Sequence, residues 1–382
     1  MAKKMNWPRV VGTLVVILAI IAIIIGVTNQ EGTTTNSDEI KIGAMFPLSG
    51  TLANLGSAMK DASQLAVDEV NLNGGINGKK FSLIVEDGKC SADDAVTAGR
   101  KLIDIDGVKA IVGPTCSTET AALGPIATSA QVVLLSPSAT KPGLTLQAGD
   151  YVFRNVAPDS YQGAEGVKIA ESLGTKKVAV LYANDEYGAA LKDVFVTEAQ
   201  AKGIQVLLTE AMDKEGKDFR TQLTKIKNAN PDLVYLVVFP KEGAIVLRQQ
   251  KELGMTNKWI AAEAIKDDEV IGTTGDAGNG VIVTTPRVTY DNEVFTKFAL
   301  DYKSKYGREP DIYAGETYDA TKILMEAAAN TDGSGRAIRE YLLNKESYTL
   351  ATGNYKFNEN REVKKDYQYW IIRNGKFEPY QV

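Results

Sequence analysis

Short apolar runs alternate with longer amphipathic stretches along the chain from residue 40 onward. The first run, IKIGAMF, spans 40–46 and is short and almost wholly apolar, which predicts a buried strand. In the stretch that follows, apolar residues recur every three or four positions, as at Met59, Ala62 and Leu65, which predicts a helix. Because strands that alternate with helices of this length form parallel sheets covered on both faces, the pattern predicts an α/β fold.

The alternation forms two series, and a stretch rich in polar and turn residues at 154–163 separates them. Two such series predict two α/β lobes. The last third of the chain is mostly helical and ends in a strand-like segment at 367–382. The predicted strands of the two series are 40–46, 79–87, 109–113, 132–136, 176–185, 204–210, 231–239 and 258–263, and the predicted helices are 56–75, 91–105, 118–129, 187–202, 218–228, 241–253, 291–306, 312–329 and 334–343.

The N-terminus carries a long apolar segment behind positive charge. Lys3, Lys4 and Arg9 precede residues 10–27, which carry no charge and reach the lower length limit for spanning a bilayer core of about 30 Å. No A-x-A-like cleavage site follows, so an uncleaved transmembrane anchor is favoured, with a cleaved signal segment as the alternative. The positive flank predicts a cytoplasmic tail at 1–9, and the polar residues 28–39 indicate a tether to an extracytoplasmic globular part.

Composition lowers the expectation of an enzyme. The chain has 382 residues, a net charge of −5 and no histidine, which removes the commonest general base and the commonest metal ligand. There is no G-x-G-x-x-G between a strand and a helix and no P-loop. A mildly acidic chain without a basic stripe is a poor nucleic-acid binder. We therefore predict a protein without metal, cofactor or nucleic acid; carboxylate or lysine catalysis is the alternative.

Two cysteines, Cys90 and Cys116, are present. Outside the cytoplasm such a pair favours a disulfide, which stabilises a loop of this size by roughly 3–4 kcal/mol in the chain-entropy model. The alternative is a pair of buried free thiols.

Polar groups follow several predicted strands, where open α/β sheets bind ligands. In the first lobe Ser117 follows one strand and opens a helix, and Ser138 and Thr140 follow the next strand. In the second lobe Tyr187 and Glu263 follow strands. Taken singly, these residues are typical of helix caps, turns, packing or surface acids. Taken together, hydroxyls opposite a glutamate complement a carboxylate and an ammonium, which predicts a zwitterion bound between the lobes.

The chain resembles the leucine/isoleucine/valine-binding proteins, the extracytoplasmic solute-binding proteins of branched-chain amino acid ABC transporters. The matching motifs run in the family's order from about Ile40 to Tyr380 and include IKIGAMFPLSGTLANLG, GPTCSTET, LLSPSATKPGLT, RNVAPDSYQG, NDEYG and GETYDATKIL. The resemblance implies the type I periplasmic-binding-protein fold, with two lobes joined by three crossings. It places lobe 1 at 40–158 and 286–352, and lobe 2 at 159–285 and 353–382.

The resemblance also implies roles on the first lobe. The Cys90 and Cys116 pair matches a family disulfide beside the ligand. Ser117 matches the residue that holds the ligand carboxylate, and Thr140 matches the threonine that contacts both charged ends. Ser138 matches a position whose backbone carbonyl accepts from the ammonium.

On the second lobe, Tyr187 matches a cleft tyrosine and Glu263 the acid that pairs with the ammonium after closure. Leu55, Phe239 and Tyr313 match positions around the ligand side chain and form an apolar set, with core packing as their alternative role. We therefore predict binding of a branched-chain or other apolar amino acid.

The function implied is delivery of that amino acid to the permease and ATPase subunits of an ABC transporter, by a monomer held on the outer face of the cell membrane. The alternative is a sensor domain that binds an amide or small carboxylate and reports to a signalling partner.

Overall fold

The computed structural model describes residues 39–289 and 292–382. The predicted tail, the predicted anchor and all but the last residue of the predicted tether lie outside the described residues. Among the residues that are described, no helix is both long enough and apolar enough to cross a membrane.

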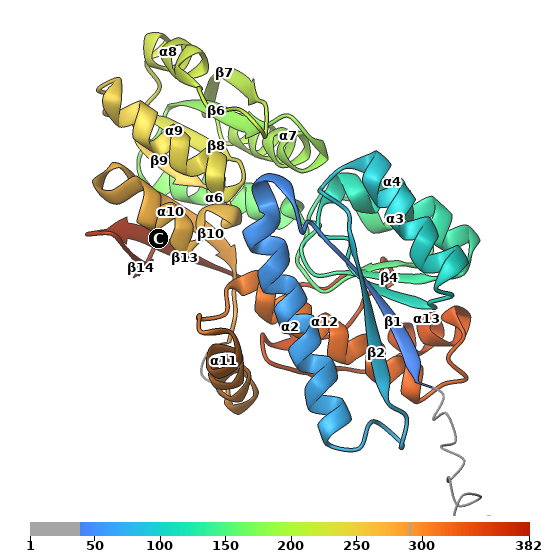
Figure 1. Cartoon of the computed structure of the whole chain (residues 1–382). Helices are drawn as coiled ribbons and strands as arrows, with labels where there is room; N and C mark the ends of the chain where they lie inside the picture. The colour runs from blue at the N-terminus through green and yellow to red at the C-terminus, as the bar shows by residue number, and fades with distance from the viewer. Residues whose placement is uncertain (1–38, 290–291) are drawn as a thin grey trace, which may run out of the picture. The chain divides into compact units, whose positions relative to one another are not determined.

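The first lobe is built on a five-stranded parallel sheet with the order β2-β1-β3-β4-β5 (Figure 1). Its helices form one layer on each face. Apolar residues of α2, α12 and α13 share one core with the sheet, and those of α3 and α4 share another. The elements are β1 (Ile40–Phe46), α2 (Ala53–Leu72), β2 (Phe81–Asp87), α3 (Ala92–Arg100) with a π-helical turn (Lys101–Ile105), β3 (Ala110–Val112), α4 (Ser117–Ser129), β4 (Val133–Ser136), α5 (Leu144–Ala148), β5 (Val152–Arg154), α11 (Glu293–Tyr306), α12 (Ile312–Ala329), α13 (Gly335–Asn344), and the short pair β11 (Tyr348–Thr349) and β12 (Asn354–Tyr355).

The second lobe has a seven-stranded sheet with the order β14-β13-β10-β9-β8-β6-β7. Helices α6 and α7 cover one face, and α8, α9 and α10 cover the other. Strand β13 pairs antiparallel with β10 and with β14, so this sheet is mixed, with a parallel part from β10 to β7. The elements are α6 (Asp159–Ser172), β6 (Lys177–Ala183), α7 (Glu186–Ala201), β7 (Gln205–Met212), α8 (Arg220–Ala229), β8 (Leu233–Val237), α9 (Pro240–Glu252), β9 (Lys258–Ala261), α10 (Asp268–Thr274), β10 (Ile282–Pro286), β13 (Tyr367–Arg373) and β14 (Lys376–Tyr380).

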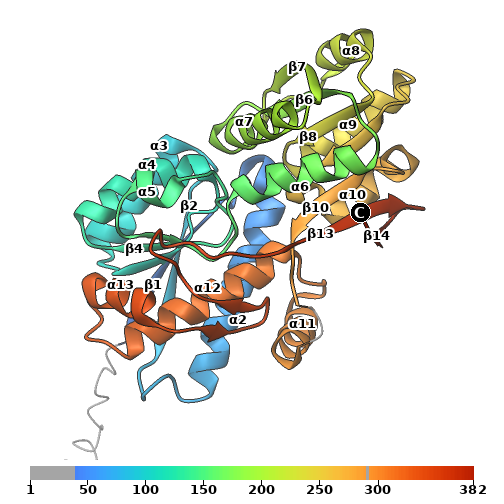
Figure 2. The ribbon, with the colours of Figure 1, turned by 180° about the vertical axis from the view of Figure 1, so that it is seen from behind.

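The chain passes between the lobes in segments that contact one another. Arg154, at the end of β5, forms a parallel bridge and an ion pair with Glu362. The Arg287 N–H donates to the Asp366 carbonyl at 2.7 Å, which joins the segment after β10 to the segment before β13. Figure 2 shows the last of these segments running past α6 toward β13. The two-lobe α/β prediction is therefore confirmed.

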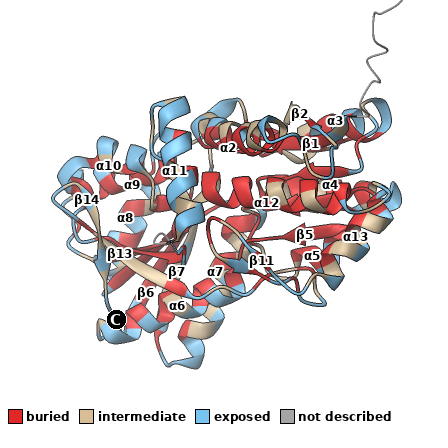
Figure 3. Cartoon of the chain, turned by 90° about the horizontal axis from the view of Figure 1, so that it is seen from below, coloured by how far each residue is buried: buried red, intermediate tan, exposed pale blue. Residues whose placement is uncertain are grey.

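Helix α12 is buried along most of its length (Figure 3), because it covers the first sheet and packs beside α2. Its small and apolar residues match that position, and its predicted bounds agree with the structure. The structure adds α5, β5, α6, α10, β10, β11 and β12, which the pattern did not predict. β5 has only three residues, and α6 begins with DSYQG, a sequence rich in turn-forming residues. Neither element therefore gives a clear periodic signal.

Candidate functional site

The two parallel sheet regions share one topology, which positions the site. The order β2-β1-β3-β4-β5 in the first lobe corresponds strand for strand to β7-β6-β8-β9-β10 in the second. Loops beyond the carboxyl ends of these strands enclose a small cleft. The cleft is lined by Leu55, Thr115, Cys116, Ser117, Ser138, Tyr187, Phe239, Pro240, Glu263, Ala264 and Tyr313.

The first-lobe wall is a pair of loops joined by hydrogen bonds. The Ser138 hydroxyl donates to the Thr115 carbonyl at 2.7 Å, and the Ser117 hydroxyl accepts from the Lys141 N–H at 3.2 Å. Gly113 has φ +104°, and a Cβ there would lie 2.5 Å from the Met45 carbonyl oxygen, so the turn that leads into this wall requires glycine. Ser117 is the first residue of α4, so the positive end of that helix faces the cleft.

Thr140 is the one predicted ligand residue that does not line the cleft. Its hydroxyl is buried and lies near the Asp159 carboxylate without a hydrogen bond of good geometry among the described residues, while its carbonyl accepts from the Asp159 N–H at 2.9 Å. The buried guanidinium of Arg154 donates to the carbonyls of Ala139 at 3.3 Å and Lys141 at 2.7 Å. Arg154, at the first crossing between the lobes, therefore holds the loop that carries Thr140.

Glu263 provides a buried carboxylate on the second-lobe wall. It lies just after β9 and is only 3% exposed. One carboxylate oxygen, Oε2, accepts from Gln162 Nε2 at 2.7 Å and from the Tyr187 hydroxyl at 3.1 Å; the other, Oε1, accepts from the Tyr313 hydroxyl at 3.4 Å. Burial raises the pKa of Glu263, and these donors oppose the rise. A cation in the cleft would stabilise the ionised form, because a buried carboxylate requires a paired charge.

Aromatic and aliphatic side chains form the remainder of the cleft. The rings of Tyr187 and Phe239 lie 5.5 Å apart between centroids. Phe239 packs against the cores of both lobes, and Leu55 and Tyr313 belong to the first-lobe side. Seven of the eight predicted ligand residues therefore line one cavity. Their roles in binding stay predictions.

The first turn of α6 contributes two residues to which the sequence analysis assigned no role. Gln162 holds Glu263 and also donates to the Thr284 hydroxyl at 3.0 Å. Asp159 is fully buried, and among the described residues neither of its carboxylate oxygens accepts a hydrogen bond of good geometry. Burial and the Glu263 charge raise the pKa of Asp159 well above its usual range, although the nearby Thr140 hydroxyl opposes the rise. Both residues stand in the motif RNVAPDSYQG, and their spacing of three on a helix was the available signal.

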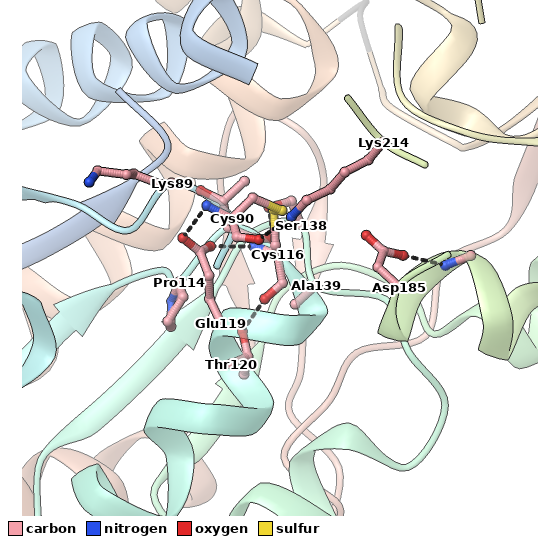
Figure 4. Close-up of a disulfide and its surroundings, with 12 residues drawn as sticks. Lys89, Cys90, Pro114, Cys116, Glu119, Thr120, Ser138, Ala139, Asp185 and Lys214 are labelled. Carbon is pink, nitrogen blue, oxygen red and sulfur yellow. Dashed lines mark hydrogen bonds between the residues drawn. A yellow bond between two sulfur atoms is a disulfide. The ribbon is translucent and has the colours of Figure 1, made fainter. Parts of the chain in front are cut away.

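The predicted disulfide is present: Cys90 and Cys116 are bonded, with their Cα atoms 5.4 Å apart. The fully buried carboxylate of Glu119 accepts from both cysteine N–H groups, Cys90 at 2.9 Å and Cys116 at 2.8 Å (Figure 4). Burial raises the pKa of Glu119 to about 7, against the effect of these two donors. The bridge and this acid together fix the loop that carries Ser117.

Over the described part of the chain, no group of three or more histidine, cysteine or acidic side chains is arranged to hold a metal ion.

The two-lobe α/β fold with a cleft between the lobes is that of a solute-binding protein. The sequence model of the periplasmic binding protein family matches residues 39–373, so the chain belongs to that family.

Three proteins illustrate the similarity. The leucine-, isoleucine-, valine-, threonine- and alanine-binding protein of Pseudomonas aeruginosa is 29% identical, over 86% of this chain and 88% of that protein. The crystal structure of the leucine-binding protein LivK of Thermotoga maritima has a TM-score of 0.83 at 28% identity, covering 90% of this chain and 98% of that one. The structure of LivJ from Streptococcus pneumoniae, a branched-chain amino acid transporter substrate-binding protein in complex with isoleucine, has a TM-score of 0.82 at 28% identity, covering 89% and 98%.

Proposed function

We propose that this protein binds the zwitterion of an apolar amino acid in the interlobe cleft and delivers it to the permease of an ABC transporter. The observation that carries the proposal is the buried Glu263 carboxylate, which lines the same small cavity as Ser117 at the positive end of α4. Relatives named for leucine, isoleucine and valine binding support this ligand class.

In this proposal the ligand carboxylate binds to Ser117, and the ammonium binds to the Ser138 carbonyl and to Glu263. Thr140, which does not line the cleft in this structure, contacts both charged ends. The side chain lies against Leu55, Phe239 and Tyr313. Tyr187 and Gln162 support the proposal because both donate to Glu263 and so orient its carboxylate.

Binding is coupled to closure of the lobes. The ligand docks first on the lobe 1 hydroxyls, and Tyr187 and Glu263 then move in with lobe 2. A ligand favours the closed state only by its differential affinity for that state. The predicted boundaries give lobe 1 as 40–158 and 286–352 and lobe 2 as 159–285 and 353–382; we propose one change to them, which moves residues 353–363 from lobe 2 to lobe 1. Because Phe357 and Val363 pack in the first core, the third crossing itself is proposed at 364–366.

We further propose that residues 10–27 anchor the protein to the cell membrane, with the binding lobes on the extracytoplasmic face. Under this proposal the tether keeps a loaded monomer near the permease at high effective concentration. The protein then carries no catalytic activity of its own. Intact-mass measurement of the chain recovered from membranes tests the anchor, since a cleaved segment would lower the mass.

The ligand proposal is tested by titration calorimetry on the full-length chain, purified in detergent and refolded from denaturant to remove bound ligand. The panel contains the common L-amino acids, several D-forms, their amides, and carboxylates without the amine. We expect tight binding of one aliphatic or aromatic L-amino acid, and much weaker binding when either charged end is removed. Binding of a carboxylate without the amine, and of no amino acid, would contradict the role of Glu263 and favour the sensor alternative. Binding of an amino acid amide alone would contradict the role of Ser117.

A further inference from the structure

The disulfide loop contacts the second lobe as well as the ligand cleft. Lys214 follows β7, and its ammonium group donates to the Cys90 carbonyl oxygen at 2.7 Å. Figure 4 shows the Lys214 side chain extended toward the disulfide from the second-lobe side. Lys214 is half-buried and does not line the ligand cleft. The contact therefore joins the lobes without involving the ligand site directly.

The Cys90 carbonyl is held ready for this contact by the first lobe. Lys89 and Cys90 both have left-handed backbone conformations, with φ +53° and +54°, which non-glycine residues rarely adopt. The disulfide and the Cys90 N–H bond to Glu119 hold this conformation from one side of the backbone. The carbonyl of the same residue accepts from Lys214 on the other side.

Charge around Lys214 favours the same arrangement. Burial raises the pKa of Glu119 in the first lobe and of Asp185 in the second, and the Lys214 ammonium opposes the rise in both. One cation therefore lies near an acid of each lobe. This is the arrangement expected of a contact that stabilises closure, since opening would separate the ammonium from Glu119 and from the Cys90 carbonyl.

A second pair of residues joins the lobes in an open groove beside the cleft, which Cys90 and Lys214 also line. Lys141 of the first lobe forms an ion pair with Glu186 of the second at 2.5 Å, with the glutamate side chain 46% exposed. An exposed pair of this kind contributes little, because water and salt screen it. The less exposed bond from Lys214 to a fixed carbonyl is therefore the stronger candidate for a closure contact.

We propose that Lys214 is a closure latch, which docks on the disulfide loop when the lobes close and sets the residence time of the ligand without touching it. The proposal rests on the proposed function, because the latch acts on the ligand through lobe closure. The disulfide then has a second role beyond stabilising the fold: it presents the Cys90 carbonyl to the second lobe.

The test compares Lys214→Met, which keeps the length of the side chain and removes its charge, with Lys217→Met, which makes the same change at an exposed lysine of the same loop. Dissociation is measured on the full-length chain by chasing labelled L-isoleucine, or the tightest-binding member of the panel, with unlabelled ligand. For Lys214→Met we expect dissociation faster by roughly 3- to 10-fold and association changed by less than about 2-fold. Lys217→Met should match the wild-type chain.

Two further measurements separate a latch from a structural role. The unfolding temperature of ligand-free Lys214→Met should equal that of the wild type, because the contact is made only on closure. The same substitution is then made in a chain with Cys90→Ser and Cys116→Ser. There, Lys214→Met should raise the dissociation rate by less than half as much as it does in the wild-type chain, because the disulfide no longer holds the carbonyl of residue 90.

The outcomes distinguish the two proposals. Wild-type dissociation rates in Lys214→Met, with binding intact, would overturn the latch and leave the amino-acid proposal standing. A lowered unfolding temperature without ligand, or a full effect of Lys214→Met in the serine background, would also overturn it. If the wild-type chain binds no amino acid, the proposed function fails and the latch fails with it.

Discussion

The two lobes share a strand order but present different chemistry to the cleft. In each, the loops after corresponding strands reach the ligand cavity, as the shared topology requires. The first lobe presents Ser117, Ser138 and a helix N-terminus, whereas the second presents Glu263 and aromatic rings. Topology thus decides where the site forms, and loop residues decide which charge each wall accepts.

The lobes also differ in how their site residues are held. The first-lobe wall is braced before any ligand arrives, by the disulfide, by Glu119 and by hydrogen bonds between its loops. The second-lobe side contains buried acids, Glu263 and Asp159, whose pKa values burial raises. Burial disfavours the ionised form of both carboxyls, and under the proposed function the ligand ammonium would stabilise the ionised form of Glu263. The first lobe therefore presents a wall that covalent and hydrogen bonds already hold in place. The second lobe presents buried carboxyls, which a bound cation would stabilise in their ionised form.

The sharpest way to break this comparison is Glu263→Gln, which removes the charge and keeps the shape. Loss of a buried charge partner costs roughly 2–5 kcal/mol, which corresponds to a Kd about 30-fold to several thousand-fold higher. The ligand-free variant should lose at most about 1–2 kcal/mol of stability, because one donor loses its acceptor oxygen while the cost of burying a charged carboxylate is removed. Calorimetry and thermal unfolding measure the two effects. Glu359→Gln, at an exposed acid, is the control, and unchanged affinity in Glu263→Gln would contradict the assignment of the second-lobe wall.

The corresponding change on the first lobe is Ser117→Ala, which should weaken binding by roughly 1.5–3 kcal/mol if its hydroxyl donates to the ligand carboxylate. The effect should largely disappear when the ligand is the amino acid amide, since the charged acceptor is then absent. Calorimetry of both proteins with both ligands gives the coupling between the hydroxyl and the carboxylate. An equal loss with acid and amide would place the role of Ser117 in the loop instead, where it accepts from the Lys141 N–H.

A smaller effect is expected on folding from Glu119→Gln, which leaves a single acceptor oxygen for two cysteine N–H groups. The free energy of unfolding should fall by about 1–2 kcal/mol because one buried donor loses its partner. The measurement is urea unfolding. If the unfolding midpoint of Glu119→Gln equalled that of the wild type, the hydrogen bonds from the two cysteine N–H groups to Glu119 would make no net contribution to the free energy of unfolding.

The same variant tests the pH dependence. Burial raises the folded-state pKa of Glu119 from 4.5 to about 7, so its stabilising contribution is fully present below pH 4.5 and is lost as pH rises through about 7. Glutamine does not titrate, so the unfolding free energy of Glu119→Gln should fall less steeply between these pH values. Glu242→Gln is the matched control: burial raises the pKa of Glu242 to about 7 as well, yet it does not bond the cysteines. It should flatten the pH profile without loosening the disulfide loop, and an unchanged wild-type slope in Glu119→Gln would contradict the raised pKa.

Much of the fold was predictable because its signals are local. β1 and α12 agree with their predicted bounds, since a buried strand and a buried helix impose clear patterns on neighbouring residues. β5 and α6 were missed, because three residues carry no period and α6 begins among turn-forming letters. The sequence pattern did not predict that the second sheet is mixed. The antiparallel pairing of β13 with β10 joins segments more than 80 residues apart, and a local pattern does not record such a pairing.

The sequence by itself determined the alternation of strands and helices, the polar residues at strand ends and, through family motifs, the candidate ligand residues and the cysteine pair. Only the tertiary structure decided that Gln162 holds Glu263, that Glu119 braces both cysteines, and that Lys214 reaches the disulfide loop. Local patterns record which face of an element is buried. They do not record which distant side chain a buried polar group meets, because that depends on how separate elements pack in space.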